Sequence, residues 1–311
     1  MRSGEGTVRE ICVIGGNRYF GKRLTARLMA AGDRVTVINR GSSAPPEGAI
    51  HLVADRNDEN SLEKALGSRT FDVVIDQVCY TPRQAEIARR VFAGRARRYV
   101  MTSTVEVYEY EDSAALVRED AVDPRTVAFD LELPWDDPEF LDSHYGEGKR
   151  QAEAVFAGTR GAEPAFPYVA VRVAHVLGGN DDFTGRLDHY TDRIRTGEPI
   201  AVPAVNHPAT YIHVEEVADF LAWAAGEDFT GPVNAASHGV LSTEELCEAV
   251  AVHIPEGRTV FRSVEVGEVS PFSFARSYGM DNSRATRLGF TFGESRDWLP
   301  RAVAETLGKD D

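Results

Sequence analysis

Length, composition and charge limit what this chain can be. Its 311 residues, 42% of them hydrophobic, can bury a large core in one large or two modest domains. A formal net charge of −15 and a pI near 5.0 argue against nucleic acid or an anionic membrane as a partner. Three widely spaced cysteines are typical of reduced thiols, and residues 1–10 have the pattern of neither a signal peptide nor a membrane span. We therefore expect a cytoplasmic protein, and we predict no metal site.

Residues 8–40 predict a strand, a glycine turn, a helix and a second strand. The unbroken apolar run 11–14 is typical of a strand buried on both faces of a parallel sheet. GGNRYFG then interrupts the run, and apolar residues recur at helical spacing up to Gly32, which suits a helix C-cap. Residues 35–38 restore a strand pattern, so the whole segment forms a βαβ unit.

The glycine turn in this unit predicts a phosphate site, because it exposes unpaired N–H groups at the positive end of a helix. Gly15 can form the tight turn and Gly21 can allow close packing, whereas Arg18 replaces the middle glycine of a dinucleotide motif. A Walker A loop is the alternative, but Arg23 stands where its magnesium-binding Ser or Thr would be.

The end of the second predicted strand bears on the cofactor. Asn39 and Arg40 stand where an acidic residue would bind the ribose 2′-hydroxyl of NAD, and an arginine there can accept a 2′-phosphate. With Arg18 able to face the same phosphate, this charge favours NADP over NAD. The alternative is that both arginines face solvent.

Further along the chain, strands and helices alternate. Strands are predicted at 51–54, 71–75 and 98–101, with a helix from Thr81-Pro82 to about residue 92. This alternation predicts a Rossmann-like α/β fold with a doubly wound parallel sheet. Asp55 follows the third strand at the edge where ligands of such sheets bind, and it can accept a bond from an adenine amino group or serve as a turn residue.

Tyr145 and Lys149 form the predicted catalytic pair. They are four residues apart in a helical pattern, so both side chains share one face. A free tyrosine has a pKa of about 10, and a neighbouring lysine cation together with an oxidised nicotinamide favours its phenolate as a base. Thr104, at the end of the fifth strand, can orient the substrate oxygen. The alternative is a surface tyrosine beside a solvated lysine.

Five segments in order, GGNRYFG, MTSTVEVY, YGEGK, VAVRVAHVLG and YIHVEEVADF, resemble the extended short-chain dehydrogenase/reductase superfamily in its NAD(P)-dependent epimerase/dehydratase family. The arginine in the glycine motif and VINRG resemble a branch with chloroplast stem-loop RNA-binding proteins and bacterial epimerase-like members. The resemblance implies a dinucleotide-binding domain, residues 1–176 with 209–236 returning to it, and a smaller substrate domain, mainly 177–311.

The same resemblance implies individual roles. Tyr145 matches the family's catalytic base, Lys149 the lysine that bonds the nicotinamide ribose, Thr104 the assisting Ser/Thr and Asp55 the adenine-contacting aspartate. Residues 77–79 occupy a segment that lines the pyrophosphate and the nicotinamide ribose. The predicted cofactor-binding residues are Gly15, Asn17, Arg18, Tyr19, Phe20, Gly21, Asn39, Arg40, Asp55, Arg56, Gln77, Val78, Cys79, Thr102, Tyr145 and Lys149.

Three further residues have weaker patterns. Glu106 matches the glutamate that removes a proton in dehydratases, but Val105 replaces their acidic partner, so elimination lacks its general acid; a solvated carboxylate is the alternative. His175 falls where many sugar-nucleotide epimerases carry a substrate-binding asparagine, or it is a packed strand-end histidine. Arg186, alone of three arginines in 186–195, is predicted to bind substrate phosphate.

The residues and the resemblance together predict an NAD(P)-dependent epimerase that acts on a sugar nucleotide, or a related polar small molecule, through a transient ketone. An NADPH-dependent ketoreductase or a dehydratase is the enzymatic alternative, and a nucleotide-sensing or RNA-binding scaffold is the alternative of another class. A homodimer through paired helices is a further expectation. The long acidic connection 108–145 is predicted to face water, with recognition of a cationic substrate as its alternative.

Overall fold

The computed structural model of the chain describes residues 8–111, 115–158 and 166–308. Most of the N-terminal segment used above, residues 1–7, and residues 112–114 of the acidic connection lie outside these ranges. None of the helices in the described ranges has the length and hydrophobicity needed to cross a bilayer.

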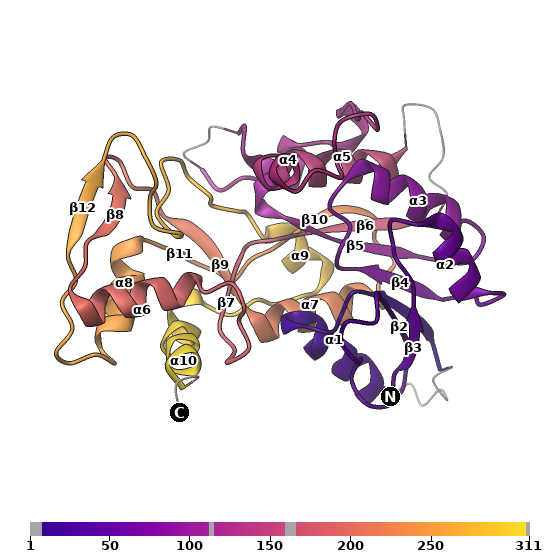
Figure 1. Cartoon of the computed structure of the whole chain (residues 1–311), viewed down its shortest axis with the longest axis horizontal. Coiled ribbons are helices and arrows are strands. Elements are labelled where there is room, and N and C mark those ends of the chain that lie inside the picture. Colours follow the sequence, from indigo (N-terminus) through magenta and orange to yellow (C-terminus); the bar gives the residue numbers. More distant parts are fainter. Residues whose placement is uncertain (1–7, 112–114, 159–165, 309–311) are drawn as a thin grey trace. The chain divides into compact units, whose positions relative to one another are not determined.

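A seven-stranded sheet forms the centre of the fold, with strand order β10-β6-β5-β4-β1-β2-β3 (Figure 1). The pairs from β3 through β2, β1 and β4 to β5 are all parallel. The predicted doubly wound Rossmann-like sheet is therefore confirmed. Its strands are β1 (Glu10–Ile14), β2 (Arg34–Asn39), β3 (Ile50–Val53), β4 (Val73–Asp76), β5 (Tyr99–Thr104), β6 (Tyr168–Val173) and β10 (Gly231–Ala235).

Helices cover both faces of this sheet. α2, α3 and α5 bury their apolar residues against one face, while α1 and α7 lie on the other (Figure 1). Thr81 caps α3 by accepting a bond from the Gln84 N–H at 3.2 Å, as its Thr-Pro start predicts. The bounds are α1 (Tyr19–Ala30), α2 (Glu59–Leu66), α3 (Pro82–Phe92), α4 (Pro138–Ser143), α5 (Tyr145–Ala157) and α7 (Val214–Ala224), with single-turn 3₁₀ helices η1 (Val105–Tyr108), η2 (Glu119–Ala121) and η3 (Pro124–Thr126).

The chain divides into two compact units. The first contains residues 1–107, 122–172 and 218–232, and the second contains residues 108–121, 173–217 and 233–311. The sequence analysis had placed the boundary near residue 176 and the return at 209–236. β9 does not enter the central sheet, because it pairs with β7 and β11 instead, so the strand expected to return the chain to the first domain belongs to the second unit.

The second unit has its own apolar core beneath two small sheets, β11-β9-β7 and β12-β8. Ser242 and Glu245 form the predicted capping box at the start of α8. Its elements are β7 (His175–Leu177), α6 (Arg186–Thr196), β8 (Ile200–Pro203), β9 (Ala209–His213), β11 (Val240–Leu241), α8 (Thr243–Ala251), β12 (Phe261–Val264), α9 (Ser283–Leu288) and α10 (Ser295–Leu307).

Candidate active site

The glycine turn after β1 has the geometry that its sequence predicts. Gly15 adopts φ +91°, and its N–H donates to the Ile38 carbonyl at 3.0 Å. A Cβ on Gly21 would lie 2.7 Å from Gly16 Cα and 2.1 Å from the side-chain oxygen of Gln77, so only glycine fits there. The turn thus brings the start of α1 against the segment that follows β4.

Unpaired polar atoms at this edge of the first unit fit a dinucleotide. Asn17 Oδ1, Gln77 Nε2 and Thr102 Oγ1 are buried and have no hydrogen-bond partner among the residues that the structure describes. Asn17 and Gln77 follow β1 and β4, and Thr102 lies in the second half of β5; the carboxyl ends of these strands share one edge of a parallel sheet. Because buried polar groups are normally bonded, these three indicate a polar ligand at that edge.

The choice between NADP and NAD depends on residues at the end of β2 and on Arg18 in the glycine turn. Asn39 Oδ1 accepts bonds from the Gly41 N–H at 2.6 Å and from His51 at 3.0 Å, so its side chain shapes the turn. Arg18 and Arg40 are exposed, and neither has an ion-pair partner in the part of the chain that the structure describes. Both guanidinium groups thus keep their charge available to a phosphate.

Two residues predicted to bind the cofactor have contacts within the protein. Asp55 Oδ1 accepts from the Asn57 N–H at 2.9 Å, which is the turn role that the sequence left open. Arg56 is 7% exposed, pairs with Asp76 at 2.7 Å, and donates to the Val78 carbonyl at 3.0 Å. Arg56 therefore holds the loop after β4, and cofactor contact by Asp55 and Arg56 stays a prediction.

Asp76 was missed by the sequence reasoning although it anchors that loop. It is fully buried, accepts from the Tyr99 hydroxyl at 2.7 Å, and accepts from the Val78 N–H at 3.0 Å. An aspartate ending an apolar strand was the available signal, because a buried carboxylate needs a partner. Burial also raises the pKa of the Cys79 thiol in this loop to about 11, so the thiol stays protonated.

The predicted catalytic pair lies on α5, which begins at Tyr145. Lys149 is 1% exposed, and its ammonium donates to the Thr102 carbonyl at 2.7 Å. The ammonium lies 4.5 Å from the centroid of the Tyr80 ring and 5.9 Å from that of Tyr145. Burial lowers the pKa of Lys149 to about 8, so the group is largely charged at neutral pH.

Two glycines bring α5 close to the loops beside it. A Cβ on Gly146 would lie 2.4 Å from the Glu106 carbonyl oxygen, and one on Gly148 would lie 2.5 Å from the Tyr80 carbonyl oxygen. Thr104, 8% exposed, accepts at its hydroxyl from the Glu106 N–H at 3.3 Å. The structure therefore gathers Thr104, Glu106 and the helix that carries the catalytic pair in one unit.

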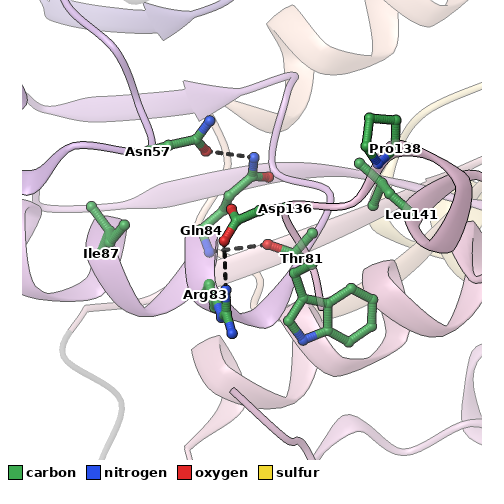
Figure 2. Close-up of a pocket in the computed structure, with 9 residues that line it drawn as sticks. Asn57, Thr81, Arg83, Gln84, Ile87, Asp136, Pro138 and Leu141 are labelled. Carbon is green, nitrogen blue, oxygen red and sulfur yellow. Dashed lines mark hydrogen bonds and ion pairs between the residues drawn. The ribbon is translucent and has the colours of Figure 1, made fainter. Parts of the chain in front are cut away.

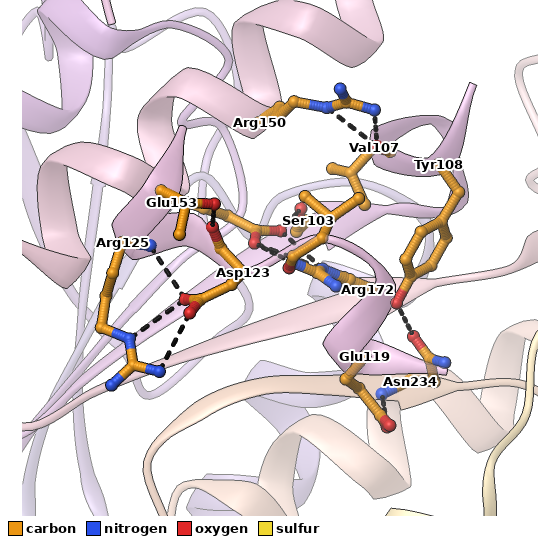
Figure 3. Close-up of polar contacts among 12 residues, drawn as sticks. Ser103, Val107, Tyr108, Glu119, Asp123, Arg125, Arg150, Glu153, Arg172 and Asn234 are labelled. Atoms are coloured by element: carbon orange, nitrogen blue, oxygen red, sulfur yellow. Dashed lines mark hydrogen bonds and ion pairs between the residues drawn. The ribbon is translucent and has the colours of Figure 1, made fainter. Parts of the chain in front are cut away.

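A buried ion pair fixes α5 to the central sheet. Glu153 accepts from Arg172 at 2.6 Å and from the Ser103 hydroxyl at 2.5 Å, and all three side chains are at most 3% exposed (Figure 3). Arg172 also donates to the Val122 carbonyl at 2.8 Å. Glu153 is one helical turn beyond Lys149. The ion pair between Glu153 and Arg172 therefore holds the part of α5 that carries Lys149 against the sheet.

In the second unit, His175 is the centre of an aromatic cluster. It stacks on Phe274 with centroids 4.8 Å apart and lies 5.3 Å from the Tyr278 ring. Burial, followed by the positive charges of Arg186 and Arg276, lowers the pKa of His175 to about 3, so the imidazole is neutral.

Polar atoms of this cluster are also unpaired. His175 Nε2, Arg186 Nε and the Tyr211 hydroxyl are buried without a hydrogen-bond partner in the described ranges, which supports a polar ligand here. The Arg186 guanidinium lies 5.1 Å from the centroid of the Phe272 ring. Arg193 instead bonds His189 and the Pro199 carbonyl, so the choice of Arg186 agrees with this packing. Tyr211 was missed, since a strand tyrosine carries no local signal of function.

One carboxylate of the acidic connection does not face water. Glu119 is 7% exposed and accepts from the Asn234 N–H at 2.9 Å, while the Tyr108 hydroxyl donates to the Asn234 side chain at 2.8 Å (Figure 3). This part of the connection is docked in the second unit. Its other carboxylates between residues 130 and 142 are exposed, as predicted.

A pocket of about 350 Å³ lies in the first unit between α3 and residues 135–141 (Figure 2). Arg83 lines it and pairs with Asp136 at 2.7 Å, and Gln84 donates to Asn57 at 2.8 Å. Its polar lining is thus bonded internally, and none of the predicted catalytic residues lines it. The described ranges also contain no cluster of three His, Cys, Asp or Glu side chains suited to a metal.

Comparison with known proteins identifies the family. Residues 11–236 match the NAD dependent epimerase/dehydratase family. The chain belongs to this family. Among curated relatives, the chain is 25% identical over 228 residues to the chloroplast stem-loop binding protein of 41 kDa b of Arabidopsis thaliana. That match covers 68% of the chain but 53% of the relative, so the chain spans about half the relative's length.

Solved structures share the fold of this chain. UDP-glucose 4-epimerase of Thermotoga maritima, crystallised with UDP-glucose, is 17% identical with a TM-score of 0.72, over 97% of this chain and 100% of that one. The enzyme WbmG of Bordetella bronchiseptica, in complex with NAD and UDP, is 17% identical with a TM-score of 0.73, over 99% and 95% of the two chains. The predicted family and fold are thus both confirmed.

Proposed function

We propose that this epimerase/dehydratase inverts a carbinol centre of a sugar nucleotide through a transient ketone, with Tyr145 as the base. The observation that carries the proposal is the placement of Lys149: a buried ammonium, bonded to the Thr102 carbonyl, beside the ring of Tyr145. Family membership and the UDP-sugar or UDP bound by structures of the same fold support this substrate class.

Each catalytic side chain has a role that follows from its chemistry. Tyr145 takes the proton of the substrate hydroxyl, and the Thr104 hydroxyl orients the same oxygen. The Lys149 cation favours the phenolate of Tyr145, and it can do so at neutral pH because its pKa is about 8. A bound nicotinamide supplies the hydride acceptor and donor. Glu106 lacks an acidic partner at Val105, which favours epimerisation over dehydration.

NADP is the proposed cofactor and NAD the second choice. The glycine turn at residues 15–21, with Asn17, Gln77 and Thr102, would hold the diphosphate and the nicotinamide ribose through their unpaired polar atoms. Arg18 and Arg40 would bind the 2′-phosphate, since both are exposed and lack an ion-pair partner in the described ranges.

Substrate recognition is assigned to the second unit. His175 Nε2 and Arg186 Nε, both buried and unpaired, would bond polar groups of the sugar nucleotide. Action in the cytoplasm, homodimer formation and the absence of nucleic-acid binding stay predictions.

The test combines cofactor binding with product analysis. Fluorescence titrations with NADPH and NADH should give tighter binding of NADPH, and Arg40→Ala should reduce that preference. Enzyme with NADP⁺ and a panel of UDP-hexoses should yield the epimer by NMR without net change in NADPH absorbance, and Tyr145→Phe should abolish it. Stoichiometric NADPH loss with a keto-sugar would instead establish a reductase, and tight, salt-sensitive RNA binding without turnover would establish a scaffold.

A further inference from the structure

Tyr80 is a residue of the first unit that the proposed chemistry has not used. It follows β4 in a loop whose preceding residues are assigned to the cofactor, and its half-buried ring lies beside two side chains of α5. The centroid of the ring is 4.5 Å from the Lys149 ammonium and 6.2 Å from the centroid of Tyr145. We propose that Tyr80 is a positioning residue, whose ring face keeps the Lys149 ammonium charged and aimed at the catalytic site.

The backbone of Tyr80 is held from both sides, which fixes the point from which its ring extends. Its N–H donates to the Gln84 side-chain oxygen at 2.6 Å, and Gln84 in turn donates to Asn57 at 2.8 Å. A Cβ at position 148 would lie only 2.5 Å from the Tyr80 carbonyl oxygen, so a residue other than glycine would collide with it. Gly148 thus lets this backbone lie against α5 next to Lys149, which brings the ring over the ammonium.

The bonding of Lys149 explains why a ring face matters. Lys149 is 1% exposed, and its ammonium has three N–H donors, one of which bonds the Thr102 carbonyl. A tyrosine face attracts a cation electrostatically, and more strongly where water is excluded. The ring therefore stabilises the charged form without occupying an N–H donor of the ammonium. The remaining donors can then bond the phenol of Tyr145 and a cofactor ribose.

Other charges act on the same ammonium and must be separated from the ring. The carboxylates of Asp76 and Glu153 raise the pKa of Lys149, whereas the guanidinium of Arg56 lowers it. Burial is the largest influence and brings that pKa to about 8. A variant of Tyr80 changes none of these charged groups, but loss of the ring also changes the burial of the ammonium, so the ring face itself is reported by two variants that keep the shape of the ring.

The experiment measures the pKa of Lys149 directly, by NMR titration of the full chain labelled with ¹³Cε-lysine. The sequence has four lysines, and Lys149→Met identifies the signal of interest. Tyr80→Phe should leave the lysine pKa unchanged, because the ring face is retained. Tyr80→Leu should lower it by about one unit, the equivalent of a desolvated cation–π contact.

A matched pair keeps the test valid if the leucine variant fails to fold. Tyr80→pentafluorophenylalanine has the ring shape of Tyr80→Phe but an inverted face potential, so its lysine pKa should fall by at least as much as in Tyr80→Leu. Equal lysine pKa values in the two ring variants would overturn the proposal. So would a drop in Tyr80→Phe as large as that in Tyr80→Leu.

The inference rests on the proposed function only for its consequence in catalysis. If Tyr80 positions Lys149, the acid limb of the kcat/KM profile should move to higher pH in Tyr80→Leu, because a less charged lysine favours the phenolate less. Failure to bind NADPH would remove the proposed function while the lysine titration still decided the role of Tyr80. Normal turnover in Tyr80→Leu with an unshifted lysine pKa would support the proposed function and refute the role of Tyr80.

Discussion

Lys149 in the first unit and His175 in the second are both buried basic groups among aromatic rings, yet they differ in charge. Burial is the largest influence on both and lowers both pKa values. Around Lys149, the carboxylates of Asp76 and Glu153 oppose it, whereas Arg186 and Arg276 reinforce it around His175. The comparison shows that burial lowers the pKa of both groups, and that the ordinary pKa of the side chain, 10.5 or 6.5, together with the sign of the neighbouring charges decides whether the buried base stays a cation.

The strongest way to break this comparison is to remove the buried cation. Lys149→Met should reduce kcat/KM by at least about 100-fold, because Tyr145 loses the charge that favours its phenolate. The measurement is turnover of the substrate identified by the epimer assay, with circular dichroism as the control for folding. Unchanged turnover would mean that the ammonium has no part in the chemistry.

A second variant removes a counter-charge instead of a base. Arg172→Met leaves the Glu153 carboxylate, 1% exposed, without its ion-pair partner. The free energy of unfolding in urea should fall by about 3–5 kcal/mol. The double variant Glu153→Met with Arg172→Met is the control and should recover most of the loss, whereas equal losses in both would show that packing, not charge, is responsible.

The neutral state of His175 predicts a pH dependence of stability. Its folded pKa of about 3 lies below the ordinary value of 6.5, so between these pH values the unfolded chain binds the proton and the folded chain does not. This contribution to stability is complete above pH 6.5 and is lost as pH falls, by up to about 1.4 kcal/mol per pH unit. Urea midpoints from pH 7 to 4 should decline less steeply in His175→Asn, and parallel curves would refute the neutral histidine.

The smallest effect on the free energy of unfolding is expected from an exposed ion pair. Arg97 pairs with Asp72 at 3.2 Å, but the arginine side chain is 85% exposed and water screens the interaction. Arg97→Gln should therefore change the free energy of unfolding by less than about 0.5 kcal/mol. A loss of unfolding free energy comparable to that of Arg172→Met would contradict the view that an ion pair contributes more to stability when it is buried.

Local pattern was sufficient for most of the fold and for placing Tyr145 and Lys149 on one helix, while their catalytic role stays a proposal. Apolar runs and glycine turns predicted the central sheet, and spacing alone put Tyr145 and Lys149 on one helix face. Contacts between segments that are distant in the sequence could not be predicted from local pattern. An arginine after a strand has the same pattern whether it faces a ligand or, like Arg56, a buried carboxylate, and nothing near Tyr80 in the sequence indicates Lys149.

Gly148 has a consequence for reading other genomes. Because its missing side chain is what admits the Tyr80 carbonyl, a glycine just before the catalytic lysine should co-occur with an aromatic residue four positions after the aspartate that ends the fourth strand. Homologues with alanine or serine there should have a displaced loop and no ring over the ammonium. A two-letter signature of this kind could divide the family into enzymes whose lysine is covered by a ring and enzymes whose lysine is not.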